Sequence, residues 1–148
     1  MESLACRARA RGKKMVFTNG CFDLLHPGHV GYLESARALG DYLVVGLNAD
    51  ASVRRLKGPS RPVTPEAARA RVLAGLSCVD RIVVFRAKRV TSLLRRLRPE
   101  IYAKGGDYTL ATLDQEERRA VEDGGGKIHI LPVWKGWSTT RILKRIFS

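Results

Sequence analysis

The chain has 148 residues, a formal net charge of +13 and three cysteines. This length fits a single domain. No apolar run is long enough for a membrane span, and the odd cysteine count without metal-ligand spacing favours a reducing cytoplasm over a disulfide framework. The charge fits a solvated surface, a field that attracts anionic substrates, or nucleic-acid binding. Nucleic acid is the least favoured partner, because the arginines form no long basic tract and no aromatic-stacking motif accompanies them.

Residues 1–14 are basic and show no clear periodicity, so we expect a loose leader or a short irregular helix before a domain of residues 15–148. They also lack the apolar stretch of a signal peptide. The first strand is expected at 15–19. It opens the segment 16–31, VFTNGCFDLLHPGHVG, around which the rest of the chain is organised.

Two histidines flank a Pro-Gly pair near the end of this segment. Proline suits the first helical position and pushes the residue before it into an extended conformation, which places His26 at the helix cap and His29 in the first turn. Both imidazoles then lie beside the free N–H groups and the positive end of a helix, which is a site for phosphate. A metal site is not expected, because Cys21 is the only soft ligand nearby.

Helix and strand patterns alternate after this segment. A helix follows His29 and ends at Gly40, and 41–48 is a near-continuous apolar run, typical of a strand buried on both faces of a parallel sheet. A short helical stretch comes next. Residues 54–62 are rich in Pro, Gly and basic residues, and fit either a plain solvated loop or a mobile basic flap over phosphates. We favour the flap, since its cations fall near the expected carboxyl ends of strands.

The second half continues the alternation. Residues 64–66 start a helix whose apolar stripe we expect at Ala68, Val72 and Leu76. The later elements are a strand at 80–85, an amphipathic helix at 89–98, a strand at 100–103, a glycine turn at 104–108, a polar helix at 113–122, a strand at 127–131 and a final helix that opens at 138–140.

This alternation predicts an α/β fold, a Rossmann-like open parallel sheet of five strands with helices on both faces. The dinucleotide-binding fingerprint G-x-G-x-x-G is absent from the sequence, and so is the P-loop motif G-x-x-x-x-G-K-[ST]. Neither motif can therefore account for phosphate binding. Two helix N-termini are expected to bind phosphate instead, one at His26 and His29 and the other at Ser138, Thr139 and Thr140. Both fall at the carboxyl ends of strands, where open α/β sheets bind ligands.

The stretch TNGCFDLLHPGH resembles the signature of the HxGH nucleotidyltransferases, the cytidylyltransferase-like superfamily, and the stretches CVDRIV and GWSTT fit the same pattern. TNGCFD, RRLKGPSRPV and KGGDY together resemble one branch, the adenylyltransferases that make ADP-heptose from ATP and D-glycero-D-manno-heptose 1-phosphate. The resemblance covers about residues 15–146. It implies transfer of AMP from ATP to a sugar 1-phosphate with release of pyrophosphate, for lipopolysaccharide or another heptose-bearing glycan.

Other members of the superfamily remain open as alternatives, namely a cytidylyltransferase for glycerol 3-phosphate or a related alcohol phosphate and an FMN adenylyltransferase. The intact histidine pair disfavours a basic nucleic-acid-binding module. Several members of the family carry a sugar-kinase domain, and 148 residues leave no room for one, so a stand-alone transferase is expected. Relatives are often dimers or larger, and we expect the same here.

By the same resemblance, His26 and His29 contact the α- and β-phosphates of ATP, and Lys57 in the flap acts as a third catalytic residue that neutralises phosphate charge. Mg²⁺ is held mainly by the triphosphate and water, which suits an ion that keeps several waters. The other nucleotide-binding residues implied are Asn19, Gly20, Cys21, Phe22, Lys104, Gly105, Asp107, Ser138, Thr139 and Thr140. The residues implied for the sugar phosphate are Asn48, Asp50, Lys57, Arg61 and Arg69. The chain departs from the family pattern at Trp137, where members usually have a smaller residue.

Overall fold

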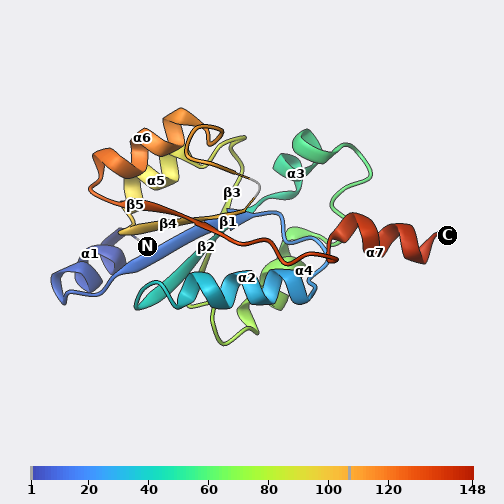
Figure 1. Cartoon of the computed structure of the whole chain (residues 1–148), viewed down its shortest axis with the longest axis horizontal. Helices are drawn as coiled ribbons and strands as arrows, with labels where there is room; N and C mark the ends of the chain where they lie inside the picture. The colour runs from blue at the N-terminus through green and yellow to red at the C-terminus, as the bar shows by residue number, and fades with distance from the viewer. Residues whose placement is uncertain (1, 107) are drawn as a thin grey trace.

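The structure is a computed structural model that describes residues 2–106 and 108–148. Five parallel strands form one sheet in the order β3-β2-β1-β4-β5 (Figure 1). The strands are β1 (Met15–Gly20), β2 (Tyr42–Asn48), β3 (Arg81–Phe85), β4 (Ile101–Gly105) and β5 (Lys127–Leu131). The helices are α1 (Glu2–Ala10), α2 (Pro27–Arg37), α3 (Asp50–Lys57), α4 (Glu66–Ala74), α5 (Thr91–Leu97), α6 (Gln115–Asp123) and α7 (Thr139–Ile146). This architecture confirms the predicted Rossmann-like α/β fold.

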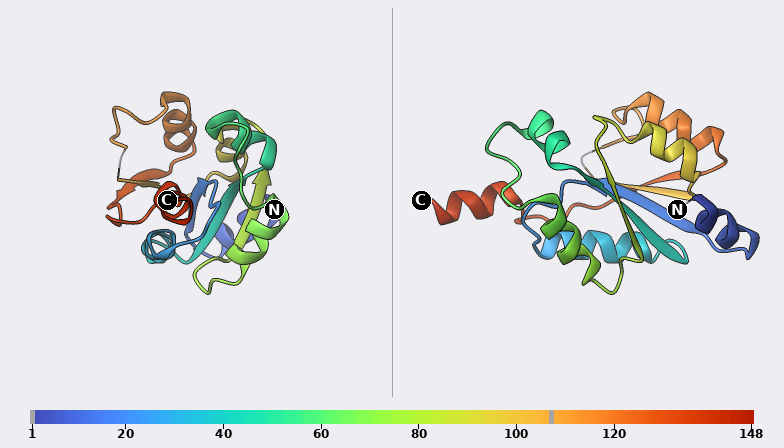
Figure 2. Two further views of the ribbon diagram at one scale, coloured as in Figure 1. Left: turned by 90° about the vertical axis from the view of Figure 1, so that its right-hand side faces the viewer. Right: turned by 180° about the vertical axis from the view of Figure 1, so that it is seen from behind.

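Each face of the sheet has its own hydrophobic core. Met15 and Phe17 of β1 pack with Val44 of β2 into one core, which α1, α5 and α6 cover. Val16, between them in sequence, points to the opposite face and packs in a second core under α2 and α4. Figure 2 shows these two helical layers on either side of the sheet. The central strands are therefore buried on both faces, as their near-continuous apolar runs predict.

The order of the strands reverses at β1. The chain runs outward from β1 through β2 to β3 and then returns to place β4 and β5 on the other side of β1. The ladder between β1 and β2 extends along all of Met15–Gly20, whereas the ladder between β1 and β4 joins Val16 to Ile101 and Phe17 to Tyr102. The carboxyl ends of β1 and β4 therefore diverge at the switch point, which is where open α/β sheets bind ligands.

The predicted apolar stripe of α4 is wrong by one position. Arg69 and Leu73 face inward, with exposed fractions of 1% and 0%, whereas Val72 is 50% exposed. Ala68 is also exposed, and Leu76, beyond the end of the helix, is half-buried. The pattern misled because an arginine occupies the inward face, where a helix of this kind normally carries an apolar residue.

The fourth strand is longer than the sequence suggests. Lys104 and Gly105 were expected in a glycine turn, but they pair with Ile130 and Leu131 and close β4. Ladder pairing with a neighbouring strand outweighs the weak strand preference of a Lys-Gly pair. Both residues still stand at the carboxyl end of the sheet, so the correction leaves them beside the expected site.

Residues 2–10 form the helix α1, which packs against the sheet. Ala5 is buried in the first core, and Arg9 Nε donates to Glu100 Oε1 at 2.7 Å. The other carboxylate oxygen of Glu100 accepts the Met15 N–H at 2.8 Å, so this one side chain joins α1 to the start of β1. In the part of the chain that the structure describes, no helix has the length and apolar character needed to cross a membrane.

Candidate active site

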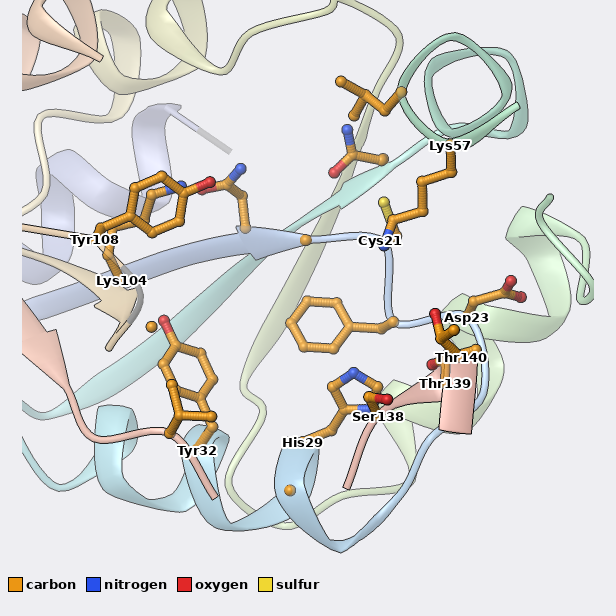
Figure 3. A pocket seen from close by; sticks show the side chains of 18 of the residues that line it. Cys21, Asp23, His29, Tyr32, Lys57, Lys104, Tyr108, Ser138, Thr139 and Thr140 are labelled. Carbon is orange, nitrogen blue, oxygen red and sulfur yellow. The ribbon is translucent and has the colours of Figure 1, made fainter. Parts of the chain in front are cut away.

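A cavity of about 780 Å³ opens at the carboxyl ends of the strands. Its volume falls in the range typical of small-molecule sites. Figure 3 shows side chains from the β1–α2 loop, α3, β4 and the start of α7 around this space. The predicted site residues that line it are Asn19, Gly20, Cys21, Phe22, His26, His29, Asn48, Lys57, Arg61, Lys104, Gly105, Ser138, Thr139 and Thr140. Asp107 lies outside the described residues.

The two histidines stand at the N-terminus of α2. His26 is the cap residue, with extended backbone at φ −140° and ψ 170°, and Pro27 opens the helix. The His26 Nδ1 atom accepts the His29 backbone N–H at 3.4 Å. Their rings stack with centroids 3.7 Å apart, and Phe22 meets His29 edge-on at 5.3 Å. The site therefore presents two imidazoles side by side at the positive end of a helix.

Burial favours the neutral form of both histidines. It lowers the pKa of His29 to about 4, with smaller contributions from the neighbouring His26 and Lys57, and it also lowers the pKa of His26. A neutral imidazole donates one hydrogen bond and accepts another. The His29 Nδ1 atom is buried and has no hydrogen-bond partner among the described residues. The Leu24 backbone acts on the His29 ring from the protein side and opposes the lowering of its pKa, so a ligand in the cavity would contact the other ring nitrogen rather than the buried Nδ1.

This burial predicts that the unliganded protein loses stability as the pH falls from about 6.5 towards about 4. The unfolded chain binds a proton at His29 in that window and the folded chain does not, so the free energy of unfolding decreases on acidification. Thermal unfolding measured at half-unit steps of pH checks this. The variant His29→Asn should show a shallower decrease between pH 6.5 and 4, and an unchanged slope would contradict the burial of this imidazole.

Residues 54–57, expected in the basic flap, belong to the last turn of α3, so the flap is limited to 58–62, and Asp23 anchors it to the β1–α2 loop. Its side chain is 1% exposed and accepts Arg61 Nε at 2.8 Å. The same carboxylate accepts the backbone N–H groups of Val63 and Thr64 at 2.9–3.0 Å. Burial alone would raise the pKa of Asp23, but these N–H groups and the Arg61 guanidinium together lower it. One end of the flap is therefore fixed, and Arg61 lines the cavity while paired with a protein carboxylate.

Lys57 enters the cavity from the end of α3, directly before the flap. It is the last residue of α3, and Figure 3 shows its side chain extending towards Cys21. Burial raises the pKa of the Cys21 thiol, although the positive charges of Lys57, Arg69 and Arg61 oppose this. The thiol is thus protonated near neutral pH, which agrees with a backbone role for Cys21 rather than a nucleophilic one.

Arg69 lies behind the cavity rather than in it. Its guanidinium donates to the backbone carbonyls of Cys21 at 2.7 Å, Asn48 at 2.8 Å and Thr64 at 2.8 Å. It also pairs with Asp50 Oδ1 at 2.8 Å. The expected contacts of Arg69 and Asp50 with the sugar phosphate are therefore not the contacts that the structure shows. The pair holds the ends of β1 and β2 together, and the donors of the guanidinium are engaged by protein acceptors.

A polar network on the far side of the cavity was missed from the sequence. The Tyr102 hydroxyl donates to Asn19 Oδ1 at 2.6 Å and lies 3.3 Å from Glu117 Oε2. Lys104 Nζ lies over the rings of Tyr102 and Tyr108 at 5.4 and 4.7 Å, and burial lowers its pKa. Glu117 could not be identified as a site residue from the sequence, because it belongs to a polar helix. Only the long-range packing of α6 on the sheet buries it.

Basic and aromatic residues complete the cavity wall. Lys88 and Arg89, which follow β3, are two of the residues that line it. Arg89 pairs with Asp114, the cap residue of α6, at 2.7 Å. Trp134 and Trp137 line the cavity from the segment between β5 and α7.

The N-terminus of α7 also lies at the cavity. Ser138 is its cap residue, and the Ser138 Oγ atom accepts the Arg141 N–H at 3.1 Å. Thr139 Oγ1 donates to the Leu24 carbonyl at 3.4 Å, which joins this terminus to the β1–α2 loop. Two helix N-termini therefore converge on one cavity, as the sequence predicts, and both favour negative charge.

Comparisons with known proteins agree with this geometry. A family model described as "Cytidylyltransferase-like" matches residues 17–145. The bifunctional protein HldE of Syntrophotalea carbinolica is 56% identical over 140 residues, which are 95% of this chain and 28% of that protein. The bifunctional protein HldE of Geobacter sulfurreducens is 51% identical over 148 residues, which are 100% of this chain and 30% of that protein. The chain thus spans less than a third of the length of these curated relatives.

A solved structure shares the fold as well. The lipopolysaccharide core biosynthesis protein from Thermoplasma volcanium GSS1 superposes with a TM-score of 0.67 and 30% sequence identity. The match covers 84% of this chain and 98% of that one. Sequence and fold therefore indicate the same family.

Proposed function

The chain belongs to the cytidylyltransferase-like family of nucleotidyltransferases, and on that premise we propose that it transfers AMP from ATP to D-glycero-D-manno-heptose 1-phosphate. The products are ADP-heptose and pyrophosphate. The observation that carries this proposal is the stacked pair of His26 and His29 at the N-terminus of α2, facing the N-terminus of α7 across one cavity.

The sugar assignment rests on the relatives and on the branch motifs. Bifunctional HldE proteins are 46–56% identical to nearly the whole chain, and the similar solved structure is described as a lipopolysaccharide core biosynthesis protein. The stretches TNGCFD, RRLKGPSRPV and KGGDY each contribute described residues to the cavity wall. ATP, a heptose phosphate and a cytoplasmic location follow from this assignment as parts of the same proposal.

In the proposed reaction, an oxygen of the sugar 1-phosphate attacks the α-phosphorus of ATP. The bond from the α-phosphorus to the bridging oxygen breaks, and pyrophosphate leaves with that oxygen. Catalysis of such a step is mainly positioning and stabilisation of charge on the phosphoryl oxygens. His26 and His29 donate to those oxygens, the free N–H groups of α2 and α7 hold the phosphate chain, and Lys57 neutralises charge from the end of α3.

Mg²⁺ would lower the negative charge of the triphosphate when it is bound. Three carboxylates of residues 2–106 and 108–148 line the cavity, and each has a protein partner: Asp23 binds Arg61, Asp114 binds Arg89 and Glu117 contacts Tyr102. Among the described residues, no group of three His, Cys, Asp or Glu side chains could hold a metal ion. We therefore expect the oxygens of the triphosphate and water to be the main ligands of Mg²⁺.

Replacing Lys57 with alanine is expected to lower kcat/KM by about 10- to 100-fold, the size of a lost charge-assisted hydrogen bond to phosphate. The fold should be unaffected, because this side chain lies in the open cavity. Steady-state kinetics with ATP and the sugar phosphate measure the effect. Arg54→Ala is the matched control, since Arg54 is an exposed cation one turn earlier on α3. Equal values for the two variants would show that Lys57 has no role in phosphate binding.

The experiment that tests the proposed function is a pyrophosphate-release assay with Mg²⁺. It compares ATP with CTP as the nucleotide, and heptose 1-phosphate with glycerol 3-phosphate and FMN as the acceptor. We expect turnover with ATP and one anomer of heptose 1-phosphate. Turnover confined to CTP, glycerol 3-phosphate or FMN would keep the chemistry and overturn the assignment of substrate.

A further inference from the structure

A tryptophan extends the histidine stack by one ring. The Trp137 ring lies 6.2 Å from the His26 ring, with 20° between the planes, and the His26 ring lies 3.7 Å from that of His29. Offset stacks of this kind occur at centroid distances of about 4.5–7 Å. The rings of Trp137, His26 and His29 therefore form one series along the cavity wall.

The stacked rings restrict the orientation of the His26 ring more than its hydrogen bond does. The His26 Nδ1 atom accepts the His29 N–H at 3.4 Å, which is long for such a bond and holds the ring weakly. Gly28 lets Trp137 approach the His26 ring closely. A Cβ atom at position 28 would lie 2.9 Å from the His26 ring and 3.3 Å from Trp137 Cβ. The two stacked neighbours therefore restrict the plane of the His26 ring.

Trp137 also connects the two helix N-termini of the site. It follows Gly136, whose positive φ of 92° turns the chain, and it precedes Ser138, the cap residue of α7. The contact of Trp137 with His26 and the hydrogen bond from Thr139 to the Leu24 carbonyl both join this turn to the β1–α2 loop. Trp137 therefore lies where the two phosphate-binding ends meet, and its own ring contact there is with His26.

We propose that Trp137 is a positioning residue of the active site, which stacks on His26 and fixes its imidazole relative to the N-terminus of α7. This inference rests on the proposed nucleotidyl transfer. Trp137 is 48% exposed, so it is not a core residue, and its removal should leave the fold intact. Its effect is therefore expected in kcat, through His26, rather than in the stability of the chain.

The kinetic test is a double-mutant cycle between Trp137 and His26. Trp137→Ala should lower kcat about two- to twelvefold, the change that corresponds to about 0.5–1.5 kcal/mol for a stacked aromatic pair, with KM for the sugar phosphate little changed. Trp137→Phe should restore most of the loss. In the His26→Ala background, Trp137→Ala should have no further effect, because the ring on which it acts is gone. Phe147→Leu is the control, since Phe147 is 83% exposed at the end of α7.

Three kinetic results would overturn the inference. They are an unchanged kcat in Trp137→Ala, the same loss in Trp137→Phe, and the same loss in the presence and absence of His26. The melting temperature of each variant, measured in parallel, shows that the fold is retained.

A spectroscopic test works without turnover. The chain contains two tryptophans, so in the variant Trp134→Phe the emission comes from Trp137 alone. ATP should change this emission, and the change should disappear in Trp134→Phe/His26→Ala. Constant emission in a protein whose melting temperature ATP raises would contradict the role of Trp137. Absence of any stabilisation by ATP would instead contradict the proposed function, so the two failures are distinguishable.

Discussion

Replacing His29 with alanine is expected to lower kcat by about 10²–10³-fold, the loss typical of one preorganised donor to a developing oxyanion. The imidazole is held between the His26 ring at 3.7 Å and the Phe22 ring at 5.3 Å, and its Nδ1 atom is buried. Such a donor is in place before the reaction and needs no reorganisation when charge develops. His26→Ala should cause a loss of similar size, because the two rings act on neighbouring phosphates in the proposed reaction.

Steady-state kinetics of pyrophosphate release measure these losses. His129→Ala is the matched control, since His129 lies in β5 and does not line the cavity among the residues that the structure describes. Its kcat should stay within about twofold of the parent value, as expected for a substitution outside the site. A near-normal kcat in His29→Ala, in a protein with an unchanged far-ultraviolet circular dichroism spectrum, would refute the role of the pair.

Replacing Arg69 with alanine is expected to lower the free energy of unfolding by about 3–5 kcal/mol, the cost of removing one partner of a buried ion pair. The guanidinium is 0% exposed, pairs with Asp50 and donates to three backbone carbonyls. Removing it leaves those acceptors buried without donors. Arg69→Lys should also destabilise the chain, because one ammonium cannot reach the acceptors that the planar guanidinium spans.

Chemical denaturation of purified variants measures this effect. Arg71→Ala, an exposed arginine of the same helix, should change the free energy of unfolding by less than about 0.5 kcal/mol. The pair of measurements also separates two roles for Arg69. A variant with normal stability and a large loss of kcat/KM would return Arg69 to the sugar phosphate, as the family resemblance implies, whereas loss of stability agrees with the contacts described above.

The fold could be predicted from local patterns because the strands are continuous apolar runs. The fifth strand matches its predicted bounds, and the second and third differ from theirs by one residue. The helix cap at His26 was also predictable, since Pro27 fixes the geometry on both sides of itself. Both are consequences of neighbouring residues alone, which a single sequence displays directly.

Long-range contacts explain what the sequence did not reveal. An arginine in an amphipathic helix normally faces solvent, and only the carbonyls at the ends of β1 and β2 make burial of Arg69 favourable. Asp23 and Glu117 are carboxylates whose partners lie 38 and 15 residues away in sequence. No local periodicity marks such residues, so their places in the site follow only from the packed structure.

The most direct test of nucleotidyl transfer uses ATP labelled with ³²P at either the α- or the γ-phosphorus. Each labelled nucleotide is incubated with the protein, Mg²⁺ and heptose 1-phosphate, and the sugar nucleotide and the pyrophosphate are separated. We expect the α-label in ADP-heptose and the γ-label in pyrophosphate. A γ-label in the sugar product would show phosphoryl rather than nucleotidyl transfer, and an absence of label from the sugar with every acceptor would contradict the proposed activity.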